Sequence, residues 1–254
     1  MSRESEVWRQ LGTVNDPELD ESVTELRFVT AVAVSPAGAV DVTFRLPTYW
    51  CAANFAFLMA EDMRLAVASL PWVTDVSVIL GDHMYADTIN AGIAAKRSFQ
   101  TSFGDASDGD LEALRRTFLV KAFQRRQVAL VEHLLAAGYA AEILADLSIA
   151  ELVALGTEEA PRKLIARYLD RRAVVGPVGT EDPAFVDEAG AAVPPEAFRA
   201  HIRALRRVAV NVEFNGALCR GLLAARFDEE ESKDREPGLL DFIHALPAEQ
   251  PSRL

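Results

Sequence analysis

The sequence predicts an α+β protein, with a small αββαβα domain over residues 1–104 and a mostly α-helical domain over residues 105–254. Strand-like alternation of apolar residues is confined to the first of these ranges, and helical spacing dominates the second. Between them, residues 104–109 (GDASDG) lack any large apolar group and have the composition of a flexible linker. With 254 residues, half of them hydrophobic, the chain is long enough to bury two cores.

The first domain is predicted element by element. Residues 5–14 have helical apolar spacing that ends at the turn Asn15-Asp16-Pro17. A hairpin follows, with strands at 28–34 and 40–46, because apolar and polar residues alternate on both sides of Ser35-Pro36-Ala37-Gly38. The remaining elements are a helix of about twenty residues after Pro47, a strand at 73–80 and a closing helix at 86–99.

The second domain is predicted as a helical bundle, with helices at 111–137, 149–155, 161–174 and 196–227. The last helix is the most regular, because its apolar residues alternate steps of four and three. These residues are Phe198, Ile202, Leu205, Ala209, Val212, Gly216, Cys219 and Leu223. At 1.5 Å per residue the helix would be roughly 45 Å long, enough for the spine of a bundle or for a dimer interface. A charged loop at 229–238 and a short helix around 239–246 would follow.

Charge and composition narrow the function classes. The chain has 26 Lys and Arg against 38 Asp and Glu, and this net charge of -12 disfavours binding to nucleic acid or to an anionic membrane. The opening residues MSRESEVWRQ do not resemble a secretory signal, and no stretch of eighteen apolar residues occurs, so we expect a cytoplasmic protein. Nucleotide-binding glycine loops, serine-hydrolase elbows and HExxH motifs are absent from the sequence, which disfavours an enzyme.

Cys51 is the main candidate for chemistry. It directly follows a predicted strand and opens a predicted helix, where the helix dipole favours a thiolate that can act as a nucleophile or metal ligand. Thr48 would support it or cap the helix. The alternative is a small buried residue among the aromatic side chains Tyr49 and Trp50. The other cysteine, Cys219, is explained by packing on the apolar seam, so no disulfide framework is expected, and a bound metal would need ligands from outside the chain.

Several motifs, taken in order, resemble one family. They are Asn15-Asp16-Pro17-Glu18-Leu19, the hairpin, Thr48-x-x-Cys51 at a helix start, and Leu70-Pro71-x-Val73-x-x-Val76-x-Val78. Over about residues 5–100 the chain resembles the small iron-sulfur cluster assembly domain of SufT/PaaD-like proteins. The resemblance implies delivery or maturation of iron-sulfur clusters or related metal centres, with Cys51 as the reactive thiol. The chain departs from the family at Ala52, where members usually have proline.

The neighbours of Cys51 each have two interpretations. Asp16 and Glu18 either terminate the first helix and form a turn, or lie beside Cys51 as hydrogen-bonding or metal-facing groups. Asp82 and His83 follow the third strand, and they form either a polar turn or, at the same end of the sheet as Cys51, a metal ligand or an acid-base group. His83 could also serve Cys51 as the base of a cysteine enzyme, a third hypothesis that we rank last.

A basic run on the first helix of the bundle is either a docking surface for an acidic partner or a solvated face. It consists of Arg115, Arg116, Lys121, Arg125 and Arg126. The leading hypothesis is an accessory factor that handles iron or a cluster transiently through Cys51, holds no intrinsic cofactor, and matures a client metalloenzyme, for which an oxygenase is the first choice by analogy. The alternative is a metal-independent, chaperone-like adaptor for a metalloenzyme subunit. Partners would be the client, an assembly protein or a second copy in a homodimer.

Overall fold

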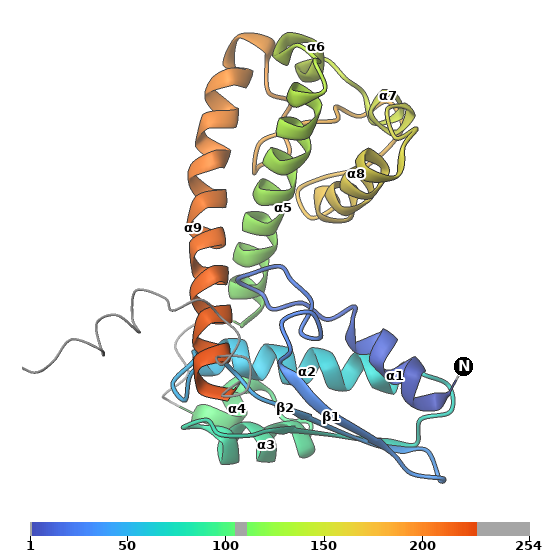
Figure 1. Cartoon of the computed structure of the whole chain (residues 1–254), viewed down its shortest axis with the longest axis vertical. Coiled ribbons are helices and arrows are strands. Elements are labelled where there is room, and N and C mark those ends of the chain that lie inside the picture. The colour runs from blue at the N-terminus through green and yellow to red at the C-terminus, as the bar shows by residue number, and fades with distance from the viewer. Residues whose placement is uncertain (1, 105–110, 228–254) are drawn as a thin grey trace, which may run out of the picture.

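The computed structural model describes residues 2–104 and 111–227 (Figure 1). A three-stranded sheet with its helices forms one end of the molecule, and a group of helices forms the other. The α+β class predicted from the sequence is therefore confirmed. The predicted linker falls mainly on residues 105–110, and the predicted loop at 229–238 and helix at 239–246 fall after 227, so these lie outside the described residues.

The first hundred residues fold as αββαβ followed by two short helices. The elements are α1 (Arg3–Leu11), β1 (Val29–Val34), β2 (Ala39–Phe44), α2 (Ala53–Ala68), β3 (Asp75–Leu80), α3 (Ala86–Ala94) and α4 (Phe99–Phe103). The predicted closing helix at 86–99 is therefore shorter, and a second short helix, which was not predicted, follows it. The chain breaks at Lys96, whose φ is 52°, and Ser98 then caps α4 by accepting a hydrogen bond from the Thr101 amide at 3.1 Å.

The sheet has the order β1-β2-β3. β1 pairs antiparallel with β2 through the predicted hairpin, and β3 pairs parallel with β2 because α2 crosses back between them. Gly38 closes the hairpin with a φ of +92°, and a Cβ there would lie 2.5 Å from the Trp72 carbonyl oxygen. Because β2 and β3 run in the same direction, the loops that leave Phe44 and Leu80 emerge at the same edge. These two loops carry Cys51 and His83.

The second half is helical, as predicted. Its elements are α5 (Leu111–Ala136), α6 (Ala141–Ala145), α7 (Ile149–Ala154), α8 (Glu159–Arg172) and α9 (Pro195–Phe227). α6 was not predicted, because five residues are too few to establish a period. Large aromatic side chains such as Phe123, Tyr168, Phe185 and Phe198 fill the core of this half. Among the described residues, no helix combines the length and the apolar character that crossing a membrane requires.

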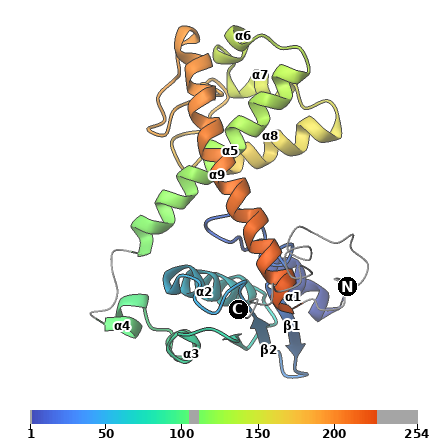
Figure 2. The ribbon, with the colours of Figure 1, turned by 60° about the vertical axis from the view of Figure 1, so that its left-hand side comes forward.

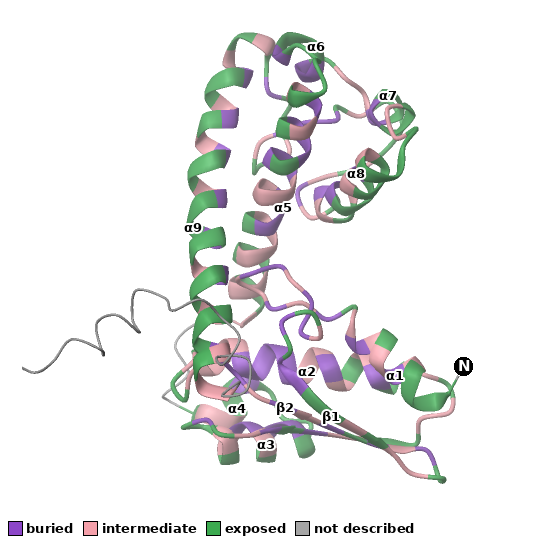
Figure 3. Ribbon diagram, in the orientation of Figure 1, coloured by how far each residue is buried: buried purple, intermediate pink, exposed green. Residues whose placement is uncertain are grey.

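α9 belongs to both cores. Its apolar seam is buried within the chain, first against α5 and the helical core, and then against the N-terminal domain, where Leu223 joins the core of the sheet. Figure 2 shows the last turns of α9 reaching the sheet end of the molecule, and Figure 3 shows its buried residues on the side that faces α5. Of the two predicted roles, spine of the bundle and dimer interface, the helix therefore has the first within this chain, because its seam is occupied by contacts within the chain.

Candidate functional site

Cys51 lies in the loop between β2 and α2, two residues before the helix begins. Its side chain is half-buried, and its sulfur lies 3.0 Å from the hydroxyl oxygen of Thr48. The N-cap residue of α2 is Ala52, which provides no side-chain acceptor for the first amides of the helix. Thr48 therefore contacts the thiol and does not cap the helix, and Cys51 lies directly before the N-cap residue.

His83 fixes the cysteine loop, which is the segment of residues 45–52 between β2 and α2. The imidazole is buried, with Nε2 located 2.8 Å from the carbonyl oxygen of Cys51 and Nδ1 accepting a hydrogen bond from the Tyr85 amide at 3.1 Å. Since Nδ1 is an acceptor, Nε2 must carry the proton and donate a hydrogen bond to the carbonyl oxygen of Cys51. The structure thus brings His83 to Cys51, as the sequence suggested, but both ring nitrogens bind backbone. In this arrangement the imidazole positions the loop and has no lone pair available for a metal or for the thiol.

Asp82 contacts α9. Its carboxylate is exposed and pairs with Arg226 in the last turn of that helix. Arg226 also stacks on Phe227 at 5.0 Å, and Phe227 contacts Arg45 in the same way at 4.0 Å. Asp82 therefore helps to hold the end of α9 beside the cysteine loop.

Asp16 forms the turn that the sequence allowed for. One carboxylate oxygen accepts hydrogen bonds from the amides of Glu18 at 2.9 Å and Leu19 at 2.7 Å. Burial nevertheless raises the pKa of Asp16 to about 6. Glu18 accepts a hydrogen bond at 2.9 Å from the side-chain amide of Asn215, on α9. Glu18 therefore contacts α9, and both residues are used structurally.

Cys219 comes to the same region from the other half of the chain. Cys51 and Cys219 are both partly buried against the N-terminal core. The pKa of the Cys219 thiol is raised to about 11, first by burial and then by the charges of Asp16, Cys51 and Glu18. The sequence showed only that Cys219 lies on the seam of its helix. Which core that part of the seam faces depends on how the two halves dock, and no motif carries that information.

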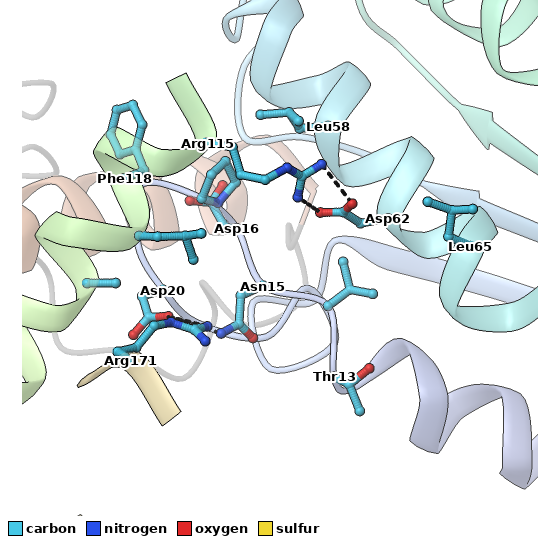
Figure 4. Close-up of a pocket in the computed structure, with 14 residues that line it drawn as sticks. Thr13, Asn15, Asp16, Asp20, Leu58, Asp62, Leu65, Arg115, Phe118 and Arg171 are labelled. Atoms are coloured by element: carbon cyan, nitrogen blue, oxygen red, sulfur yellow. Dashed lines mark hydrogen bonds and ion pairs between the residues drawn. The ribbon is translucent and has the colours of Figure 1, made fainter. Parts of the chain in front are cut away.

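Asp20 joins the two halves and was not predicted from the sequence. Its carboxylate is buried and accepts hydrogen bonds from Arg126 on α5 at 2.8 Å and from Arg171 on α8 at 2.9 Å. A cavity of about 300 Å³ lies beside it, between the α1–β1 loop, α2, α5 and α8 (Figure 4). Arg115 and Asp62 in its wall form a two-point ion pair at 2.6 and 2.9 Å. The charges of this cavity are thus engaged with one another across the junction.

The predicted basic docking surface is largely used inside the chain. Arg115 and Arg126 form the pairs just described, and Arg125 lies 3.7 Å from the carboxylate of Glu21. Arg116 is exposed, and Lys121 lies over the ring of Phe118 at 4.5 Å. Three of the five predicted cations therefore hold the helical half against the N-terminal domain.

Exposed aromatic residues flank the cysteine loop. Tyr49 is 47% exposed and Trp50 is 71% exposed. Together with Thr48, Leu222 and Arg226 they line a second cavity of about 300 Å³ between this loop and α9. The surface next to the thiol is thus apolar and open.

The ligands near Cys51 suit a soft metal only in part. Within residues 2–104 and 111–227, no three or more His, Cys, Asp or Glu side chains are grouped so as to hold a metal ion. An iron-sulfur cluster needs four ligands, typically thiolates, and the chain has two cysteines in all. The available residues therefore fit a cargo that shares its ligands with another molecule, and they do not fit a complete resident site.

Comparison with known proteins identifies the first domain. Residues 4–78, 75 of the 254 residues, match the family model described as iron-sulfur cluster assembly protein. The match runs from α1 into β3 and includes Asp16, Glu18, Thr48 and Cys51, and it ends before Asp82 and His83. No curated protein matches the chain. The N-terminal domain of this chain is therefore an iron-sulfur cluster assembly domain, extended by a helical region that the family model does not cover.

Proposed function

We propose that this chain is an accessory factor that receives iron or an iron-sulfur cluster on Cys51 and passes it to a client metalloenzyme. The family match supports a general role in iron-sulfur cluster assembly. The observation that carries the finer proposal is the half-buried Cys51 sulfur, held 3.0 Å from the Thr48 hydroxyl in a loop that His83 fixes.

This geometry suits transfer. The sulfur is positioned before the metal arrives, because the loop is tied to His83 through its backbone and to Thr48 through its side chain, so little ordering is needed on binding. Because the chain supplies few ligands, the metal keeps open coordination positions. Ligands of the client can bind there and then replace the thiolate. The exposed Tyr49 and Trp50 give the client an apolar surface beside the sulfur.

The thiol is tested by iron loading. The full chain is incubated with ferrous iron and sulfide without oxygen, desalted, and assayed for bound iron and for visible charge-transfer absorption. We expect the wild-type chain to retain iron and the Cys51→Ser chain to retain little, with unchanged circular dichroism and thermal unfolding. Thr48→Ser, which keeps the hydroxyl, should load like wild type, whereas Thr48→Val should load less. Equal loading by Cys51→Ser and wild type would refute the role of the thiol.

The client is tested separately. Coexpression of a candidate metalloenzyme, with oxygenases examined first, allows the iron content of the client to be measured with each variant. We expect the client to lose its iron with Cys51→Ser and to keep it with Thr48→Ser. Full client iron with Cys51→Ser would instead support the adaptor described next.

An exposed apolar stripe on α9 favours a second candidate function, a metal-independent adaptor. Val210, Phe214, Leu218 and Leu222 recur every four residues and are between 38% and 68% exposed. Such a stripe fits an amphipathic helix of a client subunit. Under this hypothesis Phe214→Glu would abolish client binding and activation, whereas Cys51→Ser would leave both intact. Copurification of the client with each variant distinguishes the two functions.

A further inference from the structure

The last turns of α9 place Cys219 against the N-terminal domain. Gly216, Cys219 and Leu223 follow one another at steps of three and four, so they share one face of the helix. Gly216 packs on Leu19, since a Cβ at this glycine would lie 3.6 Å from a methyl carbon of that leucine. Leu223 is buried in the N-terminal core. Cys219 lies between these two contacts and faces the same way.

Polar contacts on both sides of Cys219 fix this position. Before it, Asn215 donates to Glu18 at 2.9 Å, and just after it Arg220 donates to Glu21 at 2.8 Å. Further along, Arg226 pairs with Asp82, next to the histidine that holds the cysteine loop. From Asn215 to Leu222 the helix advances only about 10 Å. Within that length it passes from the loop of Glu18 to the loop of Cys51.

The second cavity supports the same placement. Leu222, on α9, lines it together with Thr48 and Trp50, which come just before Cys51 in its loop. Cys51 and Cys219 also pack against the same core, and the charge of Cys51 acts on the thiol of Cys219. The two cysteines of the chain therefore lie in the same region, where α9 passes the cysteine loop.

We propose that Cys51 and Cys219 together form a two-thiol binding site for a soft divalent metal ion, with the second ligand supplied by the helical extension. This inference rests on the proposed function and assigns its cargo site a second residue. On binding, each thiol loses a proton to solvent and each sulfur forms one bond to the metal, so that two protons leave as one dication enters.

The electrostatic surroundings favour such a cation. Asp16 and Glu18 lie near enough to Cys219 to raise its pKa, and their negative charges oppose a bare thiolate. A bound dication cancels the charges of the two thiolates, so no bare thiolate is left beside these carboxylates. Two sulfur ligands still leave coordination positions for a client, which suits a site that gives up its metal.

The competing interpretation is that Cys219 only fills space in the core. The two interpretations differ in metal binding, which is measured by adding cadmium ion to the reduced full chain and following the thiolate-to-metal absorption in the ultraviolet. We expect one cadmium ion per wild-type chain. Cys51→Ser and Cys219→Ser should each weaken binding by more than about tenfold, because one of two protein ligands is lost. Arg203→Ala is the control on α9, since Arg203 is exposed and lies sixteen residues before Cys219.

A second measurement tests whether the thiols are adjacent. Phenylarsine oxide condenses with two neighbouring thiols to form two arsenic–sulfur bonds and one water molecule, and intact-mass spectrometry detects the product. We expect one adduct on the wild-type and Arg203→Ala chains and none on either cysteine variant. Circular dichroism of each variant confirms that it is folded.

The outcomes separate this inference from the proposed function. If Cys51→Ser abolishes iron loading while Cys219→Ser binds cadmium and loads iron like wild type, the two-thiol site is wrong and the proposed function stands. If Cys51→Ser loads iron normally, the proposed function fails. Capture of phenylarsine oxide by wild type, together with its loss in both cysteine variants, would still support the paired thiols in that case.

Discussion

Replacing Asp20 with asparagine should destabilise the junction of the two halves. The side chain of Asp20 is 4% exposed, and those of its partners Arg126 and Arg171 are 9% and 17% exposed. Removing one partner of a buried ion pair costs about 3–5 kcal/mol, because the remaining charge stays buried without compensation. Asp170 also pairs with both arginines and would compensate in part. We therefore expect a loss near the lower end, about 3 kcal/mol.

Asparagine is the informative substitution because it changes the charge and little else. Asp20 has a φ of 49°, a conformation that asparagine also tolerates. The carbonyl oxygen of asparagine can still accept the hydrogen bond that Asn15 donates at 3.2 Å. A loss of stability then reflects the missing carboxylate and not a strained backbone.

The effect should depend on pH. Burial alone would raise the pKa of Asp20, but hydrogen bonds and charges from Arg126 and Arg171 outweigh it and hold that pKa below its usual value. The carboxylate therefore stabilises the fold above the pKa of the unfolded chain, and this contribution is lost as the pH falls through the lower pKa of the folded chain. The difference between wild type and Asp20→Asn should be full at neutral pH and should shrink in acid.

Urea denaturation followed by circular dichroism measures the difference. The matched control is Glu132→Gln, because Glu132 pairs with Arg206 on the surface, where the two side chains are 45% and 52% exposed. Such exposed pairs contribute less than about 1 kcal/mol. If Asp20→Asn loses no more stability at neutral pH than Glu132→Gln does, the proposed importance of the buried junction is refuted.

Three further predictions concern single residues. Asp16→Asn should raise the free energy of unfolding at pH 7.5 by up to about 3 kcal/mol. Burial raises the pKa of Asp16 to about 6, so the wild-type chain loses stability as the pH rises from about 4 toward 6, whereas the asparagine variant does not. Urea denaturation of both chains across this pH range measures the difference in stability, and a difference that does not change with pH would contradict the prediction. Leu223→Ala should lower the free energy of unfolding by about 2–5 kcal/mol, and Leu222→Ala by much less, since Leu223 is 5% exposed and Leu222 is 38% exposed. Equal losses of stability in thermal denaturation would mean that α9 does not complete the N-terminal core. His83→Phe should release the cysteine loop and speed alkylation of Cys51 by iodoacetamide, and an unchanged rate would show that the imidazole does not hold the loop.

The elements that could be predicted from sequence are those with a clear period. The hairpin, α2, α5 and α9 each contain enough alternating or helical apolar positions to be recognised alone. The segment between α1 and β1 has no such pattern, although Leu19, Val23 and Leu26 in it are buried. Its shape is set by local bonds such as those to Asp16, and by the arginines that reach Asp20 from the other half. A prediction from the local spacing of apolar residues contains neither of these two kinds of contact.

The candidate site likewise contains residues that local sequence features identify and one residue that they do not. Cys51 could be found because its position after a strand and before a helix is a local feature, and the structure brings His83 beside it because β2 and β3 run parallel. The proximity of Cys219 depends on where α9 docks, and the seam of that helix has the same spacing along both cores. Periodicity indicates that a residue is buried, but not which core buries it.

Because α9 is part of both hydrophobic cores, it affects the order in which the chain can fold during synthesis. Domains usually fold in the order in which they leave the ribosome, but the core around the sheet includes Leu223, which is translated after every other residue of that core. The core around the sheet is therefore complete only after the helices behind it have been made. We expect the cysteine loop of a nascent chain to reach its final packing together with α9 and not before it.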